Sequence, residues 1–112
     1  MSYPRYEIFK DTKKEYRFRL LDKYKDNILA ASEGYTTKAN CENAIAICQE
    51  NSPYDKNYAR RTTVSNKYYF TLRSDNGRDI GISKDYDTAT NRDAGIEVVK
   101  RDGPTKTVVD LT

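Results

Sequence analysis

The 112-residue sequence contains no histidine and no tryptophan, only two cysteines and three prolines, and no long hydrophobic run. Without histidine, the most common general base of enzymes is missing, and a zinc site would lack its usual nitrogen ligand. No stretch approaches the roughly 20 apolar residues that span a membrane, and the N-terminus has no apolar signal region. These absences predict a cytoplasmic protein that does not act at a membrane, is not an enzyme, and holds no metal ion or other cofactor.

The charge balance also lacks a strong bias. The sequence has 20 Lys and Arg against 17 Asp and Glu, a net charge of +3, which by itself is too small to indicate nucleic acid as the partner. What is abundant is tyrosine, with ten copies. A tyrosine ring can pack at the edge of a core while its hydroxyl reaches water, or it can stack on a ligand.

The two cysteines, Cys41 and Cys48, fall in one predicted helix. Seven residues along a helix separate them by roughly 10 Å, whereas a disulfide needs Cα atoms closer than about 7 Å. The same distance prevents them from sharing one metal ion. We therefore expect two buried, reduced thiols that act as small hydrophobic side chains.

A tandem repeat organises the chain. Residues 32–53 recur without a gap at residues 83–104, each position 51 residues later. A match of this length predicts one domain built of two repeats, about residues 5–57 and 58–112. The identical positions are Ser32 and Ser83, Tyr35 and Tyr86, Thr37 and Thr88, Asn40 and Asn91, Ile45 and Ile96, and Pro53 and Pro104.

The sequence pattern of each repeat predicts strands followed by a helix. Apolar and polar residues alternate in residues 15–20 and 67–73, the period of a half-buried strand, and further strands are expected at residues 6–10, 28–32, 54–64, 79–83 and 107–109. Helices are expected after Thr37 and Thr88, whose hydroxyls suit N-caps, and are stopped near Pro53 and Pro104. The first helix has a buried stripe of Cys41, Ala44, Ile45 and Cys48. Gly95, inside the second helix, predicts a close approach of that helix to the sheet.

These features resemble the YegP-like family. The residues that carry the resemblance are Ser32-Glu33-Gly34-Tyr35, Cys41-Glu42-Asn43-Ala44-Ile45 and, in the second copy, Arg92-Asp93-Ala94-Gly95-Ile96. The resemblance covers nearly the whole chain. The chain departs from it at Ala44, where glycine is usual, and at Ala94, where asparagine is usual.

The resemblance implies an α+β fold of two β-β-β-α-β units. It implies a single antiparallel sheet with two helices packed on one face, closing strands exchanged between the units, and a monomer. It implies no activity, because the family is functionally uncharacterised.

The alternation leaves one face of the sheet uncovered. If Tyr16, Phe18 and Leu20 face the helices, then Arg17 and Arg19 face away, and Tyr69 and Arg73 do so in the second repeat. We expect a non-enzymatic binding or interaction module with a protein or a small ligand as its partner. The alternative is single-stranded nucleic acid bound by the arginines and aromatic rings of the open face.

Tyr35 and Tyr86 precede the helices in equivalent positions. Two interpretations stay open for them: a ring that faces a ligand, or a ring wedged between loop and sheet as a structural staple.

Overall fold

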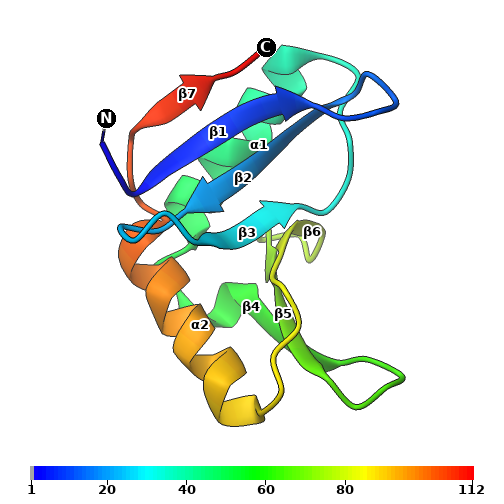
Figure 1. The fold of residues 1–112 in the computed structure, drawn as a ribbon, viewed down its shortest axis with the longest axis vertical. Coiled ribbons are helices and arrows are strands. Elements are labelled where there is room, and N and C mark those ends of the chain that lie inside the picture. Colours follow the sequence, from blue (N-terminus) through cyan, green and yellow to red (C-terminus); the bar gives the residue numbers. More distant parts are fainter. Residues whose placement is uncertain (1) are drawn as a thin grey trace.

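A computed structural model describes residues 2–112 and arranges them as one seven-stranded sheet with two α-helices against it (Figure 1). Within these residues, neither helix is long and apolar enough to cross a membrane. A short 3-10 helix, η1, lies at the end of the first repeat and was not predicted from the sequence. In chain order the elements are β1 Arg5–Lys10, β2 Tyr16–Leu21, β3 Asn27–Ala31, α1 Lys38–Asn51, η1 Asp55–Asn57, β4 Tyr58–Thr62, β5 Tyr68–Arg73, β6 Asp79–Ile82, α2 Ala89–Asp102 and β7 Val108–Asp110.

Each helix leads into a strand that joins the other repeat's half of the sheet. The strand order is β4-β5-β6-β3-β2-β1-β7, so β4 follows α1 and pairs with β5, while β7 follows α2 and pairs with β1. The expected α+β fold with exchanged closing strands is therefore confirmed.

One detail of the sheet differs from the expected antiparallel arrangement. The other pairings are antiparallel, but β7 runs parallel to β1, which makes the sheet mixed. The reason is that α2 ends beside the start of β1, where the Tyr6 hydroxyl donates a hydrogen bond of 2.8 Å to the carbonyl oxygen of Gly103. The chain that leaves α2 therefore enters β7 in the direction of β1.

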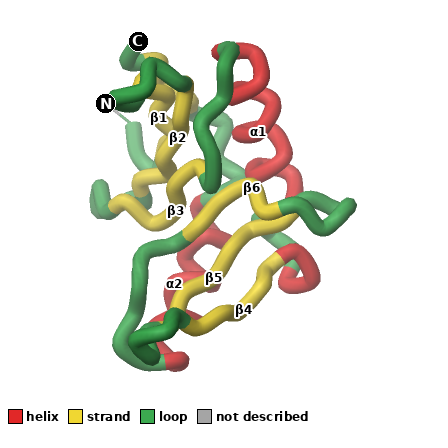
Figure 2. Tube along the Cα trace, turned by 90° about the vertical axis from the view of Figure 1, so that its right-hand side faces the viewer, coloured by secondary structure: helices red, strands yellow, loops and turns green. Residues whose placement is uncertain are grey.

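The sheet bends where the repeats meet, and both helices lie on the inner side of the bend (Figures 1 and 2). At this junction β3 and β6 pair through Ala30 with Ile82 and Ala31 with Gly81, and the Ser32 amide donates a hydrogen bond of 3.0 Å to the Ile80 carbonyl oxygen. Helix α1 lies against β2, β5 and β6, and α2 lies against β3 and β5, so each helix contacts both repeats. The expectation that both helices pack on one face is confirmed.

One hydrophobic core between the sheet and the helices unites the two repeats. Phe18 and Leu20 of β2 and Phe70 and Leu72 of β5 are at most 1% exposed, as the alternation of the strands predicts. The helices contribute Cys41, Ala44, Ile45 and Cys48 from α1, and Gly95, Ile96 and Val99 from α2.

The helix starts also agree with the sequence. The Thr37 hydroxyl accepts a hydrogen bond of 3.1 Å from the Asn40 amide, and the Thr88 hydroxyl accepts one of 3.0 Å from the Asn91 amide. At Gly95 the close neighbour is not the sheet, as expected, but the Tyr86 side chain from the segment before α2, because a Cβ there would collide with the Tyr86 ring and hydroxyl.

Both cysteines are free and fully buried. Burial raises the pKa of the Cys41 thiol to about 11 and also raises the pKa of the Cys48 thiol. Both sulfur atoms therefore stay protonated at neutral pH and pack as small apolar groups.

Candidate functional site

The outer face of the sheet carries four of the six residues singled out from the sequence. Arg17 and Arg19 lie on β2, and Tyr69 and Arg73 lie on β5. Because successive strand residues point to opposite faces, the burial of Phe18 and Phe70 in the core places these four on the outer side. They form two groups, since β6 and β3 lie between β5 and β2.

Glu7 of β1 organises the group in the first repeat. Its carboxylate accepts a hydrogen bond of 2.8 Å from Nε of Arg19 and one of 2.6 Å from Nη2 of Arg5. Burial alone would raise the pKa of Glu7, but the hydrogen bonds from Arg19 and Arg5 outweigh it and hold the pKa below its ordinary value. The Arg19 guanidinium also lies over the Phe9 ring, 4.8 Å from the ring centroid, a cation–π contact.

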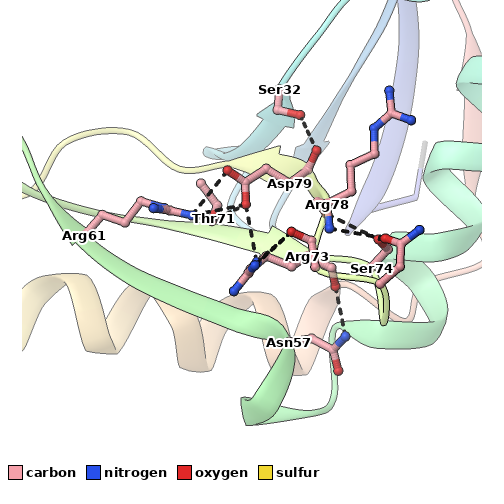
Figure 3. A network of polar contacts seen from close by, with 10 residues as sticks. Ser32, Asn57, Arg61, Thr71, Arg73, Ser74, Arg78 and Asp79 are labelled. Atoms are coloured by element: carbon pink, nitrogen blue, oxygen red, sulfur yellow. Dashed lines mark hydrogen bonds and ion pairs between the residues drawn. The ribbon is translucent and has the colours of Figure 1, made fainter.

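Asp79 of β6 organises the group in the second repeat, as Figure 3 shows. Its carboxylate accepts a hydrogen bond of 3.0 Å from the Thr71 hydroxyl and bonds of 3.4 Å from Nη2 of Arg61. Nε of Arg73 completes the group with an ion pair of 3.7 Å. Arg73 also donates a hydrogen bond of 2.8 Å to the carbonyl oxygen of Gly77 in the following turn. Each group is thus an acidic side chain held between two arginines.

Arg17 is oriented from the side, by the turn between β1 and β2. Its Nε donates to the Asp11 carboxylate at 2.9 Å, and its Nη1 donates to the Ala31 carbonyl oxygen at 3.3 Å. All three arginines predicted as site residues therefore have intramolecular partners, although the side chains of Arg17 and Arg19 remain 35% exposed and that of Arg73 remains 40% exposed.

Tyr35 and Tyr86 do not belong to this face. Their backbones pair with Tyr16 and Tyr68, the first residues of β2 and β5, through reciprocal hydrogen bonds of 2.6–2.8 Å. Both rings pack against the core, and the Tyr86 ring stacks on Phe70 at a centroid distance of 6.5 Å. The six predicted residues therefore lie in two separate regions.

Two clefts lie between the repeats, one beside each helix, and were not predicted from the sequence. The α1 cleft, of about 500 Å³, lies between the start of α1 and the β5–β6 turn. The α2 cleft, of about 510 Å³, lies between the start of α2 and the β2–β3 turn. Each cleft takes one wall from each repeat, so the sequence of one repeat does not reveal it. The α1 cleft includes Glu33, Tyr35, Asn40, Asn43, Asn76 and Arg78; the α2 cleft includes Asp22, Asp26, Lys84, Asp85, Tyr86 and Asn91.

The two clefts are repeat equivalents with different charges. Glu33 and Arg78 form an ion pair of 2.5 Å across the α1 cleft. The equivalent positions of the α2 cleft hold Lys84 and Asp26, with the signs exchanged, and within residues 2–112 these two form no ion pair. Lys84 lies instead over the Tyr86 ring, 5.6 Å from its centroid. The charges of the α1 cleft balance, whereas the α2 cleft has four aspartates, Asp22, Asp26, Asp85 and Asp87, against Lys84.

The Tyr35 hydroxyl is the unusual group of the α1 cleft. It is one of two buried side-chain polar atoms within residues 2–112 that have no hydrogen-bond partner, the other being Oδ1 of Asn57. Burial, and next the charge of Glu33, raise the pKa of Tyr35 to about 12. The hydroxyl is therefore a neutral donor and acceptor at any physiological pH. A buried polar atom without a partner costs about 1–3 kcal/mol, so this position is unfavourable for stability alone.

The side chains of the α1 cleft suit hydrogen bonding better than proton transfer. Asn40 and Asn43 offer amide donors and acceptors, Glu33 and Arg78 neutralise each other, and Tyr35 does not ionise near neutral pH. Within residues 2–112, no group of three or more His, Cys, Asp or Glu side chains could hold a metal ion.

Known proteins are similar to this chain in sequence and in fold. The family described as "Domain of unknown function (DUF1508)" matches residues 11–58 and 64–110, one copy in each repeat. A UPF0339 protein of Acinetobacter baylyi is 43% identical over 107 residues, 96% of either chain. UPF0339 protein YegP of Escherichia coli K12 is 38% identical over 107 residues, again 96% of either chain.

A solved structure agrees with the fold. The solution NMR structure of yegP from E. coli, described as a protein of unknown function, superposes with a TM-score of 0.89 at 37% identity, covering 96% of this chain and 91% of that chain. The resemblance noted from the sequence is thereby confirmed, and the chain belongs to the uncharacterised DUF1508 family, with two copies of its domain.

Proposed function

We propose that the protein is a non-catalytic binding module that holds a small polar ligand in the α1 cleft. Ligand sites are ordinarily concave and combine apolar walls with a few convergent polar groups. The α1 cleft has apolar walls from Ala44, Ile47 and Ile80, and polar groups from both repeats. A ligand seated there would touch α1 and the β5–β6 turn at once.

The observation that carries the proposal is the Tyr35 hydroxyl, buried in the cleft wall without a hydrogen-bond partner. The internal repeat provides a comparison, because Tyr86 occupies the equivalent place but its hydroxyl is not one of the buried polar atoms without a partner. Features shared by both clefts serve the common fold, whereas features of one cleft alone need another reason. Asn43, whose repeat equivalent is Ala94, is a second such feature.

The balanced charge of the cleft favours a neutral or zwitterionic ligand over an ion. A net charge on the ligand would be left without a counterion once Glu33 and Arg78 are paired.

The absence of catalysis is part of the same proposal. A general acid or base works best with a pKa near the operating pH, whereas burial moves the pKa of Tyr35 away from neutrality. The cytoplasm is the proposed location, because two free thiols suit a reducing compartment.

The test is a two-dimensional NMR titration of ¹⁵N-labelled protein with the small-molecule fraction of a bacterial lysate. We expect shifts confined to amides around the α1 cleft. The variant Asn43→Leu, which fills that cleft, should abolish them, whereas the matched variant Ala94→Leu in the α2 cleft should leave them unchanged. Shifts that survive Asn43→Leu, or that do not occur with the wild-type protein, would refute the proposal. Capture of a protein by the tagged chain, lost on the same substitution, would instead favour a protein partner.

A further inference from the structure

The outer face of the sheet carries two arginine–aromatic pairs that the proposed cleft does not use. Phe9 of β1 lies directly across from Arg17 of β2, and Arg61 of β4 lies directly across from Tyr69 of β5. The two pairs occupy equivalent positions of the two repeats, but the residue types are exchanged. Arg61 stands where the first repeat has Phe9, and Tyr69 stands where it has Arg17. Each half of the face therefore presents a cation beside a ring, although the residues themselves are not repeated.

The arginines of this face are held in place by hydrogen bonds, but some of their guanidinium nitrogens make none within the described residues. Arg19 is held to Glu7 through Nε, and within residues 2–112 neither of its terminal amino groups makes a hydrogen bond. Nη2 of Arg17, Nη1 of Arg61 and Nη1 of Arg73 are likewise without a partner among the described residues. A guanidinium already held through one or two of its nitrogens loses less side-chain entropy when a remaining nitrogen binds an anion.

The charge of the face favours an anionic partner. Five arginines, Arg5, Arg17, Arg19, Arg61 and Arg73, point to the same side as three carboxylates, those of Glu7, Asp11 and Asp79. Two positive charges remain in excess, although the whole chain carries only +3.

From these contacts we infer that the outer face binds single-stranded nucleic acid. The free guanidinium donors would contact phosphates, and bases would stack on Tyr69 and on the Arg19 guanidinium that covers Phe9. An acidic protein segment would pair with the arginines but would not need the aromatic rings of this face.

The bend of the sheet favours a single strand over a duplex. Strands β5 and β1 are four positions apart, or roughly 19 Å at the usual spacing, and the face lies on the outer side of the bend (Figure 2). A flexible single strand can follow such a surface and reach both arginine groups. A duplex, which is stiff over about 150 base pairs, would contact only one group.

The test is fluorescence anisotropy with short labelled oligothymidylate and oligouridylate at low and near-physiological salt. Arg61→Ala should weaken binding and lower the log–log salt slope by about one. Tyr69→Ala, which changes no charge, should weaken binding about tenfold or more. The matched control is Arg60→Ala, which removes the neighbouring arginine of β4 on the helix side, where Arg60 pairs with Asp55. It should leave binding unchanged, and circular dichroism should report folded protein for all three variants.

Several outcomes would overturn the inference. They are no binding by the wild-type protein at low salt, an equal loss in Arg60→Ala and Arg61→Ala, and equal affinity for a duplex of the same length. Competition by polyglutamate as strong as that by the oligonucleotide, together with an unchanged affinity of Tyr69→Ala, would assign the face to an acidic protein partner instead.

Discussion

Ser52 and Gly103 occupy equivalent positions at the ends of α1 and α2, and they contact each other. A Cβ atom at Gly103 would lie 2.5 Å from the Cβ and Oγ atoms of Ser52. The two helices therefore end at one point, and only one of the two positions has room for a side chain. Gly103 has φ of −60°, which any residue can adopt, so glycine is required there for space and not for backbone freedom.

Gly103→Ala should therefore destabilise the protein by about 1–3 kcal/mol through overpacking. In a Ser52→Gly background the same substitution should cost less, because the side chain that it meets has been removed. Part of the loss should persist, since the new Cβ would still lie 2.7 Å from the Val99 carbonyl oxygen. Urea unfolding of the four proteins measures the coupling. An identical loss in both backgrounds would contradict the contact.

Two buried tyrosines donate hydrogen bonds to the carbonyl oxygens of Gly103 and Ser52 at these helix ends. The Tyr6 hydroxyl donates to the Gly103 carbonyl oxygen at 2.8 Å, and the Tyr58 hydroxyl donates to the Ser52 carbonyl oxygen at 2.7 Å. Tyr6→Phe and Tyr58→Phe should each lower the free energy of unfolding by about 1 kcal/mol, because each leaves a buried carbonyl unpaired. Tyr24→Phe is the control, since Tyr24 is 70% exposed and should change nothing. A loss in only one of the two buried variants would contradict the equivalence.

The features predicted correctly are those encoded by short sequence patterns. Alternation in β2 and β5, the Thr37 and Thr88 caps and the stop near Pro53 are local, so the chain itself reveals them. The exchange of β4 and β7 is a long-range feature, and it was expected from the family resemblance and not from these local patterns.

The features that the sequence did not predict arise where segments distant in the chain contact each other. The parallel pairing of β7 with β1 follows from where α2 ends, and the α1 cleft needs Glu33 of one repeat beside Arg78 of the other. Residue type suggested that Arg19 was available for a partner, but the carboxylate of Glu7, twelve residues earlier in the chain, already holds its Nε. Alternation predicts the face of such a residue and not its neighbours.

The exchanged strands predict the oligomeric state. Because β7 occupies the edge beside β1, the tandem chain itself supplies the strand that a second chain would otherwise have to provide. We expect light scattering after size-exclusion chromatography to give the mass of a monomer at micromolar concentration. A dimer mass under the same conditions would refute this expectation.

We expect the contribution of Glu7 to the free energy of unfolding to depend on pH. Its pKa in the folded protein lies below the ordinary value, so the ionised carboxylate stabilises the fold above its unfolded pKa of about 4.3. This stabilisation is lost as the pH falls through the folded pKa. Glu7→Gln should therefore cost about 3 kcal/mol at neutral pH, because it breaks a buried ion pair, and the difference from wild type should shrink below about pH 4. Urea unfolding across this range measures the difference, with the exposed Glu50→Gln as control; a pH-independent difference would be contrary to the prediction.

The four hairpin turns share one conformation. In each turn the N–H of the first residue donates a hydrogen bond to the carbonyl oxygen of the fifth, and the fourth residue has a positive φ. The turns are residues 11–15, 22–26, 63–67 and 74–78. The Asn76-Gly77 pair correctly indicates a hairpin, but only Gly77 of the two has positive φ, so the turn is not the two-residue type that this pair usually forms. The equivalent positions of the other turns hold Lys14, Lys25 and Asn66.

Lys14 therefore occupies a backbone conformation, φ of 63°, that costs an L-residue about 1–2 kcal/mol and that glycine adopts freely. Lys14→Gly should remove this cost, offset in part by the greater entropy of glycine in the unfolded chain. A net gain of up to about 1 kcal/mol should raise the Tm by roughly 4–8 °C. The control is Lys13→Gly, one residue earlier in the same exposed turn and without a positive φ, which should lower the Tm. If scanning calorimetry finds that both substitutions lower the Tm equally, the turn conformation assigned to Lys14 is wrong.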